Sequence, residues 1–255
     1  LMQTLTIRNT VFGDGIPKIC IPIVGKNKKE IFQNSAEISL LQPDCMEWRI
    51  DWFENYSDET EVLSVLKELR KTIGSIILIA TFRTQKEGGK AQLPYRDYEK
   101  LNLHIAKTGF ADLIDVEAFS YGEISENLID RIHLSGTKVI GSSHDFNRTP
   151  PLNEMLNRLR KLQNMNADIP KLAVMPKSTA DVLNLMMATN TMAFEYADRP
   201  IITMSMSGIG CISRMTGELF GSAVTFANAG HASAPGQPDI VSLRAALSLV
   251  HNTLH

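Results

Sequence analysis

The stretch Ile169-Pro170-Lys171-Leu172-Ala173-Val174-Met175-Pro176 is a short apolar run closed by prolines. Such a run is typical of a buried strand. Lys171 does not fit the pattern, because an isolated ammonium group is costly to remove from water. A lysine in this setting is either paired or partly neutral, and a partly neutral amine is a nucleophile toward carbonyl carbon.

Apolar, β-branched runs of this kind recur along the chain and decide its fold. They occupy residues 18–25, 45–51, 75–83, 112–118, 138–145, 169–176, 200–206 and 222–228. Their starts are 22 to 37 residues apart, which leaves room for one crossover helix each. Most gaps carry helical periodicity, with Gly109 and Gly136 as stops and a capping box at Ser178 and Asp181. Helices are less clear after the first and seventh runs.

Eight strands alternating with helices predict an α/β fold, a (β/α)₈ TIM barrel formed by residues 1–255 as a single domain. An open doubly wound sheet is the alternative, but no GxGxxG follows the first run. Before the barrel, Thr4 to Arg8 alternates in polarity, and Val11-Phe12 is followed by Gly13-Asp14-Gly15. This pattern predicts a short N-terminal hairpin.

Composition excludes several classes of protein. The chain has 255 residues, 44% of them hydrophobic, and a net charge of −2. There is no basic stripe for nucleic acid, no basic amphipathic helix for a membrane surface, and no apolar run long enough to span a bilayer. The three cysteines are far apart without a CxxC spacing, so neither a zinc knuckle nor a disulfide framework is expected. Without a signal-peptide pattern, we expect a cytoplasmic protein.

Charged residues lie on the inner face of the predicted strands. Glu47, Arg49 and Asp51 alternate with apolar residues, and in a barrel the apolar set packs against the helices. Other charged residues in or at the ends of strands are Arg83, Asp115, Glu117, His144 and Lys171. An ionic interior is costly unless it is paired or used. The alternatives are a structural ion network, carboxylates that only orient arginines, a core histidine, and a lysine that reaches solvent.

The convergence of these groups at the carboxyl ends of strands predicts an active site, because this face of the barrel carries catalysis. Burial and the cationic neighbours Arg49 and Arg83 are expected to favour the neutral amine of Lys171. A nearby imidazole moves protons with an effect of about 10²–10⁴-fold. An arginine fork suits a carboxylate. The predicted chemistry is a Schiff base followed by proton abstraction beside the carbonyl carbon.

Several motifs then make the sequence specific. They are Glu47-Trp-Arg-Ile-Asp51, Phe82-Arg-Thr-Gln-Lys-Glu-Gly-Gly89, Ser143-His-Asp-Phe146, Ile169 to Pro176, Met204-Ser-Met206, Ser213-Arg214, Phe220-Gly-Ser222, Thr225-Phe226 and Ser233-Ala-Pro-Gly-Gln237. Together they span nearly the whole chain, and it resembles the type I 3-dehydroquinate dehydratases, the imine-forming enzymes of the shikimate pathway.

The resemblance implies a reaction and its catalytic residues. Lys171 is expected to attack the ring ketone of 3-dehydroquinate and form an imine. His144, with Glu87 as its partner, is expected to remove a proton from the adjacent ring carbon and to assist departure of the hydroxyl. The result is a syn elimination of water, and hydrolysis frees 3-dehydroshikimate for the synthesis of chorismate and aromatic amino acids.

The resemblance also implies substrate-binding residues. Arg214 is expected to clamp the carboxylate, helped by Ser233 and Gln237, and residues 232–237 to close as a lid. The remaining set is Glu47, Arg49 and Arg83, for hydroxyls and charge, and Met204, Met206 and Phe226, as apolar walls. The resemblance further implies a homodimer and an N-terminal hairpin that closes the bottom of the barrel. It implies no metal and no organic cofactor.

Three alternatives stay open. A class I aldolase-type lyase would use the same lysine on another carbonyl substrate, and should carry a phosphate cradle after the last two strands. A metal-dependent isomerase would use Glu47, Asp115, Glu117 and His144. A catalytically silent barrel would tolerate Lys171→Met.

Overall fold

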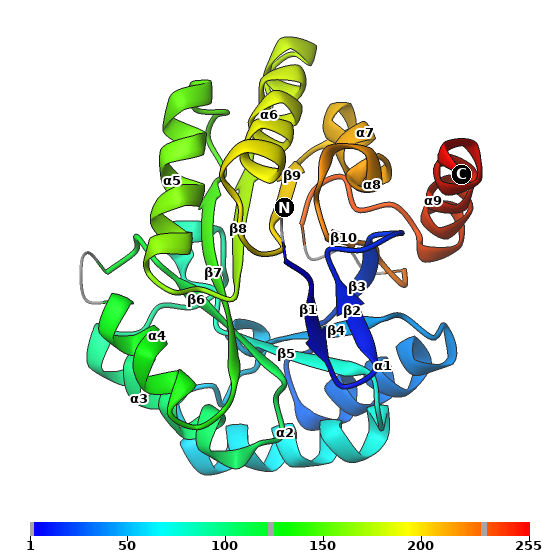
Figure 1. Ribbon diagram of the computed structural model, residues 1–255. Coiled ribbons are helices and arrows are strands. Elements are labelled where there is room, and N and C mark those ends of the chain that lie inside the picture. The colour runs from blue at the N-terminus through cyan, green and yellow to red at the C-terminus, as the bar shows by residue number, and fades with distance from the viewer. Residues whose placement is uncertain (1–2, 122–124, 231–233) are drawn as a thin grey trace.

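Eight parallel strands surround a central axis, with the helices outside them (Figure 1). The computed structural model describes residues 3–121, 125–230 and 234–255. The strands are β3 (Lys18–Ile23), β4 (Cys45–Arg49), β5 (Ile77–Thr81), β6 (Leu113–Glu117), β7 (Lys138–Asp145), β8 (Ile169–Val174), β9 (Ile202–Ser205) and β10 (Val224–Phe226). Each lies within one of the predicted runs, so the eightfold alternation is confirmed.

The barrel closes between its last strands. Hydrogen-bonded neighbours run in the order β10-β3-β4-β5-β6-β7-β8-β9, and a single parallel bridge joins Ile201 to Ser222. The amide of Ala223 also donates to the carbonyl of Ile201 at 2.8 Å. The open doubly wound sheet is therefore wrong, because such a sheet would leave two edges apart.

Helices fill the intervals between strands. They are α1 (Lys28–Leu40), α2 (Glu59–Ile73), α3 (Tyr95–Thr108), α4 (Ser125–His133), α5 (Leu152–Asn164), α6 (Thr179–Thr191), α7 (Ile212–Met215), α8 (Gly217–Phe220) and α9 (Ile240–Leu254). Gly109, at φ 66°, ends α3, and the side chain of Ser178 and the carboxylate of Asp181 form the predicted capping box. A π-helical turn, η4 (Met192–Tyr196), extends α6.

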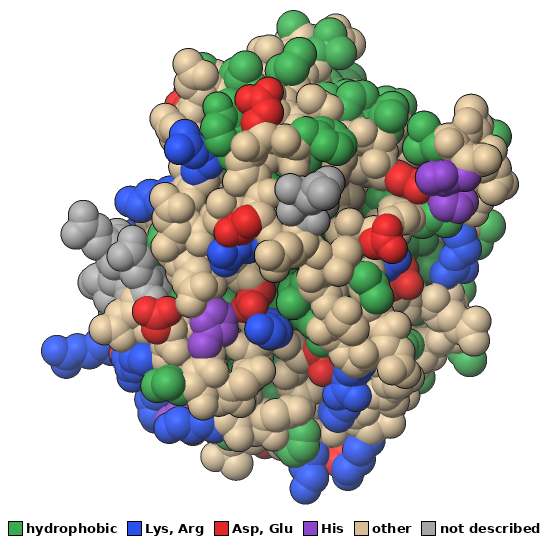
Figure 2. Space-filling model, in the orientation of Figure 1, with side chains coloured by type: hydrophobic (Ala, Val, Ile, Leu, Met, Phe, Trp, Pro, Cys, Tyr) green, Lys and Arg blue, Asp and Glu red, His purple; other side chains and the backbone are tan. Residues whose placement is uncertain are grey.

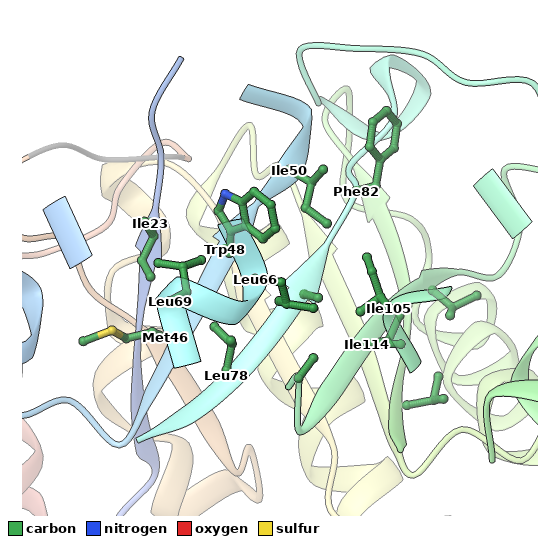
Figure 3. Packing of buried hydrophobic residues seen from close by; sticks show 14 of the residues in the cluster. Ile23, Met46, Trp48, Ile50, Leu66, Leu69, Leu78, Phe82, Ile105 and Ile114 are labelled. Carbon is green, nitrogen blue, oxygen red and sulfur yellow. The ribbon is translucent and has the colours of Figure 1, made fainter. Parts of the chain in front are cut away.

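The outer face of the barrel holds the larger apolar cluster. Met46, Trp48 and Ile50 alternate along and just beyond β4 and pack against residues of α2 such as Leu66 and Leu69 (Figure 3). The intervening Glu47 and Arg49 are therefore turned to the inside, as the alternation predicts. Strand β4 ends at Arg49, and Asp51 lies in a short 3-10 turn, η1 (Ile50–Trp52), which the sequence places in the strand.

The N-terminal hairpin closes one end of the barrel. Strands β1 (Leu5–Ile7) and β2 (Thr10–Phe12) pair in antiparallel register. Ile7 and the fully buried Phe12 join an interior cluster that includes Cys45 near the start of the barrel. Arg8 at the turn pairs with Asp112 at 2.6 Å, just before β6. This end is thus plugged by apolar side chains, which leaves the opposite, carboxyl end of the strands for polar groups.

Within the described part of the chain, none of the helices combines the length and the apolar character that a membrane span requires.

Candidate active site

A small cavity opens at the carboxyl ends of the barrel strands. Its volume is about 40 Å³. Ten of the twelve predicted site residues line it: Glu47, Arg49, Arg83, Glu87, His144, Lys171, Met204, Met206, Phe226 and Gln237. Ser233 lies outside the described residues. Arg214 lies just behind the wall, with Nη1 at 3.8 Å from the sulfur of Met204. Sequence alone had not singled out Phe146 and Ala173 as lining residues.

Lys171 lies in β8, and its side chain is buried and paired. Its Nζ is 3.0 Å from Oδ2 of Asp115, 3.7 Å from Oε1 of Glu47, and 4.7 Å from the ring centroid of Phe226. Only 3% of the residue is exposed, so the alternative of a lysine that reaches solvent is wrong. Thr81 fixes Glu47 by donating to the same oxygen at 2.9 Å. The amine therefore lies between two carboxylates and beside an aromatic ring, closed off from solvent.

Arg83 links the acids of β6 to one another. Its Nη2 is 2.8 Å from Asp115 and its Nη1 is 3.2 Å from Glu117. Burial would raise the pKa of Asp115, but Arg83 and Lys171 hold that pKa well below its usual value. Both carboxylates thus orient an arginine, as one interpretation of the sequence predicts. Asp115 also contacts the Lys171 amine. This contact could not be predicted from the sequence, because it depends on the three-dimensional arrangement of the strands.

His144 and Glu87 form a largely buried pair beside the lysine. Oε2 of Glu87 lies 2.8 Å from Nδ1 of His144 and also accepts from its backbone amide at 3.0 Å. Ser120 donates to the other oxygen at 2.9 Å, a contact that no sequence motif indicates. Burial, then the charge of Glu117, raises the pKa of Glu87 to about 8. Burial, then the charges of Arg83 and Lys171, lowers the pKa of His144 well below its usual value.

The loop that carries Arg83 and Glu87 is fixed by Asp51. Its carboxylate accepts from the backbone amides of Arg83 at 3.3 Å and Lys90 at 2.9 Å, and it grips the Arg49 guanidinium at 2.8 and 2.9 Å. A side chain at Gly89 would overlap the carbonyl group of Arg83, so the close turn requires glycine there. Asp51 is therefore a positioning residue.

Arg214 is a buried cation whose guanidinium faces no acid among the described residues. It is 1% exposed, Nε has no hydrogen-bond partner, and Nη2 donates to the carbonyl of Pro235 at 3.3 Å. Burial lowers the pKa of Arg214 to about 10, so it remains charged at neutral pH. A buried guanidinium without a counter-ion is suited to bind an anion, and its fork matches a carboxylate.

The arrangement offers a buried amine, an imidazole with a partner carboxyl, and a cationic anchor. Glu47, Asp115, Glu117 and His144 do not form a cluster of metal ligands in the described ranges, because the Lys171 amine and the Arg83 guanidinium lie against the carboxylates. The geometry favours amine and proton-transfer chemistry on a small anionic carbonyl compound.

Comparisons with known proteins point the same way. The sequence model described as type I 3-dehydroquinase matches residues 19–253. A 3-dehydroquinate dehydratase of Syntrophotalea carbinolica is 47% identical over 250 residues, covering 98% of this chain and 99% of that protein. One from Clostridioides difficile is 47% identical over 255 residues and covers 100% of both chains.

Solved structures agree in fold. A crystal structure of type I 3-dehydroquinate dehydratase from Clostridium difficile, with covalent modified comenic acid, superposes with a TM-score of 0.96 at 48% identity, covering 99% of this chain and 100% of that one. The enzyme of Geobacillus kaustophilus gives a TM-score of 0.96 at 37% identity, covering 99% and 98%.

Proposed function

The chain belongs to the type I 3-dehydroquinase family, and from that premise we propose that it dehydrates 3-dehydroquinate to 3-dehydroshikimate through a Schiff base on Lys171. The observation that carries the proposal is the buried Lys171 amine, 3.0 Å from Asp115, in a cavity that His144 also lines. The carboxylates that surround the amine offer acceptors for the proton it must lose before it attacks.

The reaction proceeds in four steps. The neutral amine of Lys171 adds to the ring ketone, and the resulting carbinolamine loses water to give a protonated imine. The free Nε2 of His144 removes a proton from the adjacent ring carbon, and the electron pair moves into the imine to form an enamine. The enamine expels the hydroxyl group β to the original carbonyl carbon, with His144 returning the proton to the departing oxygen in a syn elimination. Water then hydrolyses the imine and restores the amine.

The Glu87 carboxyl group prepares His144 for both transfers. Because it bonds to Nδ1 at 2.8 Å, it fixes the ring and leaves Nε2 to face the reactants. Arg83, paired with three acids, keeps positive charge beside the imidazole and opposes protonation of the resting base. Neutral imidazole is the form that a proton acceptor requires.

Arg214 binds the ring carboxylate in this proposal, helped by Gln237 and, as the family resemblance implies, by Ser233. The Pro235 carbonyl accepts from Arg214 at 3.3 Å and takes the place of a substrate oxygen. The cavity, at about 40 Å³, is far smaller than the roughly 300–1,000 Å³ of a typical small-molecule site. Residues 234–237 must therefore move outward to admit a six-membered ring, as a lid does.

The aldolase-type alternative is less well supported. It needs cationic or backbone groups for a phosphate after the last two strands. The group at that place is Arg214, a fork that fits a planar carboxylate. We assign the chain to aromatic amino acid biosynthesis in the shikimate pathway and to the cytoplasm on the basis of the family resemblance.

We also propose that the protein is a homodimer. Hydrophobic side chains gather over the α6 and α7 side of the molecule in Figure 2. Leu183 and Met187 of α6 are 66% and 55% exposed, and Ile209 and Ile212, at and just after the 3-10 turn η5 (Gly208–Gly210), are 46% and 43% exposed. Helix α6 contacts η5, so these side chains can form one surface.

The test is borohydride reduction during turnover, followed by peptide mass mapping. Incubation of the full chain with 3-dehydroquinate and borohydride is expected to leave a ring adduct on Lys171. Lys171→Met is expected to abolish both adduct and dehydration. His144→Ala is expected to lower kcat by about 10²–10⁴-fold while still forming some adduct. An adduct on another lysine, or full activity of Lys171→Met, would contradict the proposal.

A further inference from the structure

A cluster of two histidines and a glutamate lies away from the cavity, where α8 meets the end of α9. Nδ1 of His251 is 2.8 Å from Oε1 of Glu218, and Nε2 of His255 is 3.3 Å from the same oxygen. One donor atom from each of the three residues lies within 4.8 Å of the other two. In Figure 2, histidine side chains lie beside an acidic one near the C-terminal helix. We propose that this cluster binds a divalent transition-metal ion of the Zn²⁺ class.

The spacing of the donors fits such an ion. Zn²⁺ binds imidazole nitrogen and carboxylate oxygen at about 2.0–2.2 Å, so two donors in a tetrahedral site lie about 3.4 Å apart. The separation from Oε1 of Glu218 is 2.8 Å for His251 and 3.3 Å for His255, and all three donors lie within 4.8 Å of one another, so side-chain rotation can bring them to that spacing. Two imidazoles and one carboxylate leave the fourth position for water. This donor set suits Zn²⁺, Co²⁺ or Ni²⁺ rather than Mg²⁺ or Ca²⁺, which prefer oxygen.

The backbone holds the two nitrogens on one side of a helix. His251 lies in the last turn of α9, and His255 directly follows the helix with its amide donating to the His251 carbonyl at 3.2 Å. The spacing of four residues keeps the two rings on one face, with their centroids 4.8 Å apart. His255 is exposed, which gives an ion a direct route from solvent. An ion here would join the last helix to α8 through ligands, Glu218 and His251, that are 33 residues apart in the chain.

A second observation concerns the carboxylate itself. The Glu218 side chain is only 9% exposed, and its Oε2 is buried with no hydrogen-bond partner. Burying an acceptor oxygen without a hydrogen-bond partner is unfavourable. Because Oε1 already contacts both imidazoles, the carboxylate group faces the cluster, and Oε2 is free to become a second oxygen ligand or to accept from bound water.

Other histidines in the structure do not have this arrangement. His104 pairs with Glu59, and His133 pairs with Asp168 at 2.7 Å. Neither pair has a third possible ligand nearby among the described residues. In that part of the chain, the Glu218 cluster is the group whose three donor atoms lie within 4.8 Å of one another. His104 therefore supplies a matched control, a helical histidine with one carboxylate partner.

The cluster lies far from the reacting groups. Segment α8 precedes β10, so Glu218 is near the amino end of that strand, whereas Lys171 and His144 face the carboxyl ends. Helix α9 has 15 residues at 1.5 Å each, which places its last turn about 20 Å from its start. The metal would thus stabilise the docking of α9 and leave the catalytic step unchanged.

The experiment titrates the metal-free full chain with Zn²⁺ by calorimetry and with Co²⁺ by visible absorption. We expect one ion per chain at micromolar concentration, the d–d band of a four- or five-coordinate Co²⁺ site, and a Tm raised by several degrees with Zn²⁺. His255→Gln, which changes an exposed side chain, is expected to weaken Zn²⁺ binding by about 100-fold and to remove the Tm shift.

His104→Gln is expected to bind Zn²⁺ as the unmodified protein does, and kcat for dehydration is expected to be the same with and without Zn²⁺. The proposal is overturned if His255→Gln and His251→Gln bind Zn²⁺ as tightly as the unmodified chain. It is also overturned if no Co²⁺ band and no heat of Zn²⁺ binding appear, in which case the cluster is a hydrogen-bonded group only. Both outcomes leave the Schiff-base proposal untouched, because that proposal is tested by adduct formation.

Discussion

The Glu87–His144 pair illustrates how burial acts in opposite directions on an acid and a base. Loss of water disfavours the charged form of each, so the pKa of Glu87 rises to about 8 while the pKa of His144 falls. The two groups are 2.8 Å apart and titrate as a unit. Below about pH 8 the pair holds an additional proton, and above it Nε2 of His144 is free to act as a base.

The pH dependence of kcat/KM tests whether the Glu87–His144 pair is the titrating group. Two variants should shift the acid limb of the pH profile in opposite directions. For the unmodified chain, we expect kcat/KM to fall about tenfold per pH unit on the acid side. Glu87→Gln removes the carboxyl group that holds the extra proton, so its acid limb should move to lower pH, with a lower plateau. Ser120→Ala removes a hydrogen bond that lowers the Glu87 pKa, so its acid limb should move to higher pH. Acid limbs that stay in place in both variants would exclude the pair as the titrating group.

Single residues differ in how far the sequence alone could place them. Alternation along β4 was enough to turn Glu47 and Arg49 inward, because Met46 and Trp48 need an apolar environment outside the barrel. The contact of Asp115 with Lys171 was not predicted, since β6 and β8 are separated in the barrel by β7 and only the side-chain lengths bring the charges together. Ser120 lies in a loop with no periodicity, and its contact with Glu87 had no sequence signal.

At the scale of elements, apolar periodicity predicted the helices that bury a wide stripe. Helix α2 buries five residues on one face, and its boundaries follow from that stripe. Helix α1 buries only Ile31, Ser35 and Ile38, a narrow stripe that includes a hydroxyl group, so its pattern was weak. After β9 the chain forms α7 and α8, each four residues long, which is too short for a period of 3.6 to be recognised.

The hairpin offers a prediction about stability that should leave catalysis alone. Phe12 is fully buried against the inner residues at the amino end of the barrel, so Phe12→Ala should lower the free energy of unfolding by about 3–5 kcal/mol. Val11, on the other face of β2 and 36% exposed, supplies the control, and Val11→Ala should cost well under half as much. Urea unfolding measures both. Equal stability of the two variants would mean that the hairpin does not plug the barrel, and kcat should be unchanged in each.

At the scale of the whole molecule, polarity divides the barrel along its axis. The amino end is filled by apolar side chains from the hairpin and the starts of the strands. The carboxyl end contains Lys171, Arg83 and their acids, of which Glu87, at 6%, is the most exposed. An ionic network of this kind is costly to bury, and the apolar cluster that surrounds the barrel offsets that cost. The sequence predicted the charged carboxyl end, because Arg83 and His144 lie near the ends of their predicted strands, but it did not predict which side chains fill the amino end.

The sequence pattern says least about the oligomeric state of the protein. Single exposed leucines are common on protein surfaces, and only their neighbours in space show whether they form an interface. If the α6 surface joins two copies, the double variant Leu183→Glu, Met187→Glu would bury charges without partners. We therefore expect the dissociation constant of the dimer to rise by at least about 100-fold. Sedimentation velocity over a concentration series measures this. Leu134→Glu alters a leucine that is 88% exposed outside that surface and should leave the dimer intact. If the double variant stays dimeric at the same concentrations, the interface lies elsewhere. A monomer in the unmodified protein would rule out the homodimer.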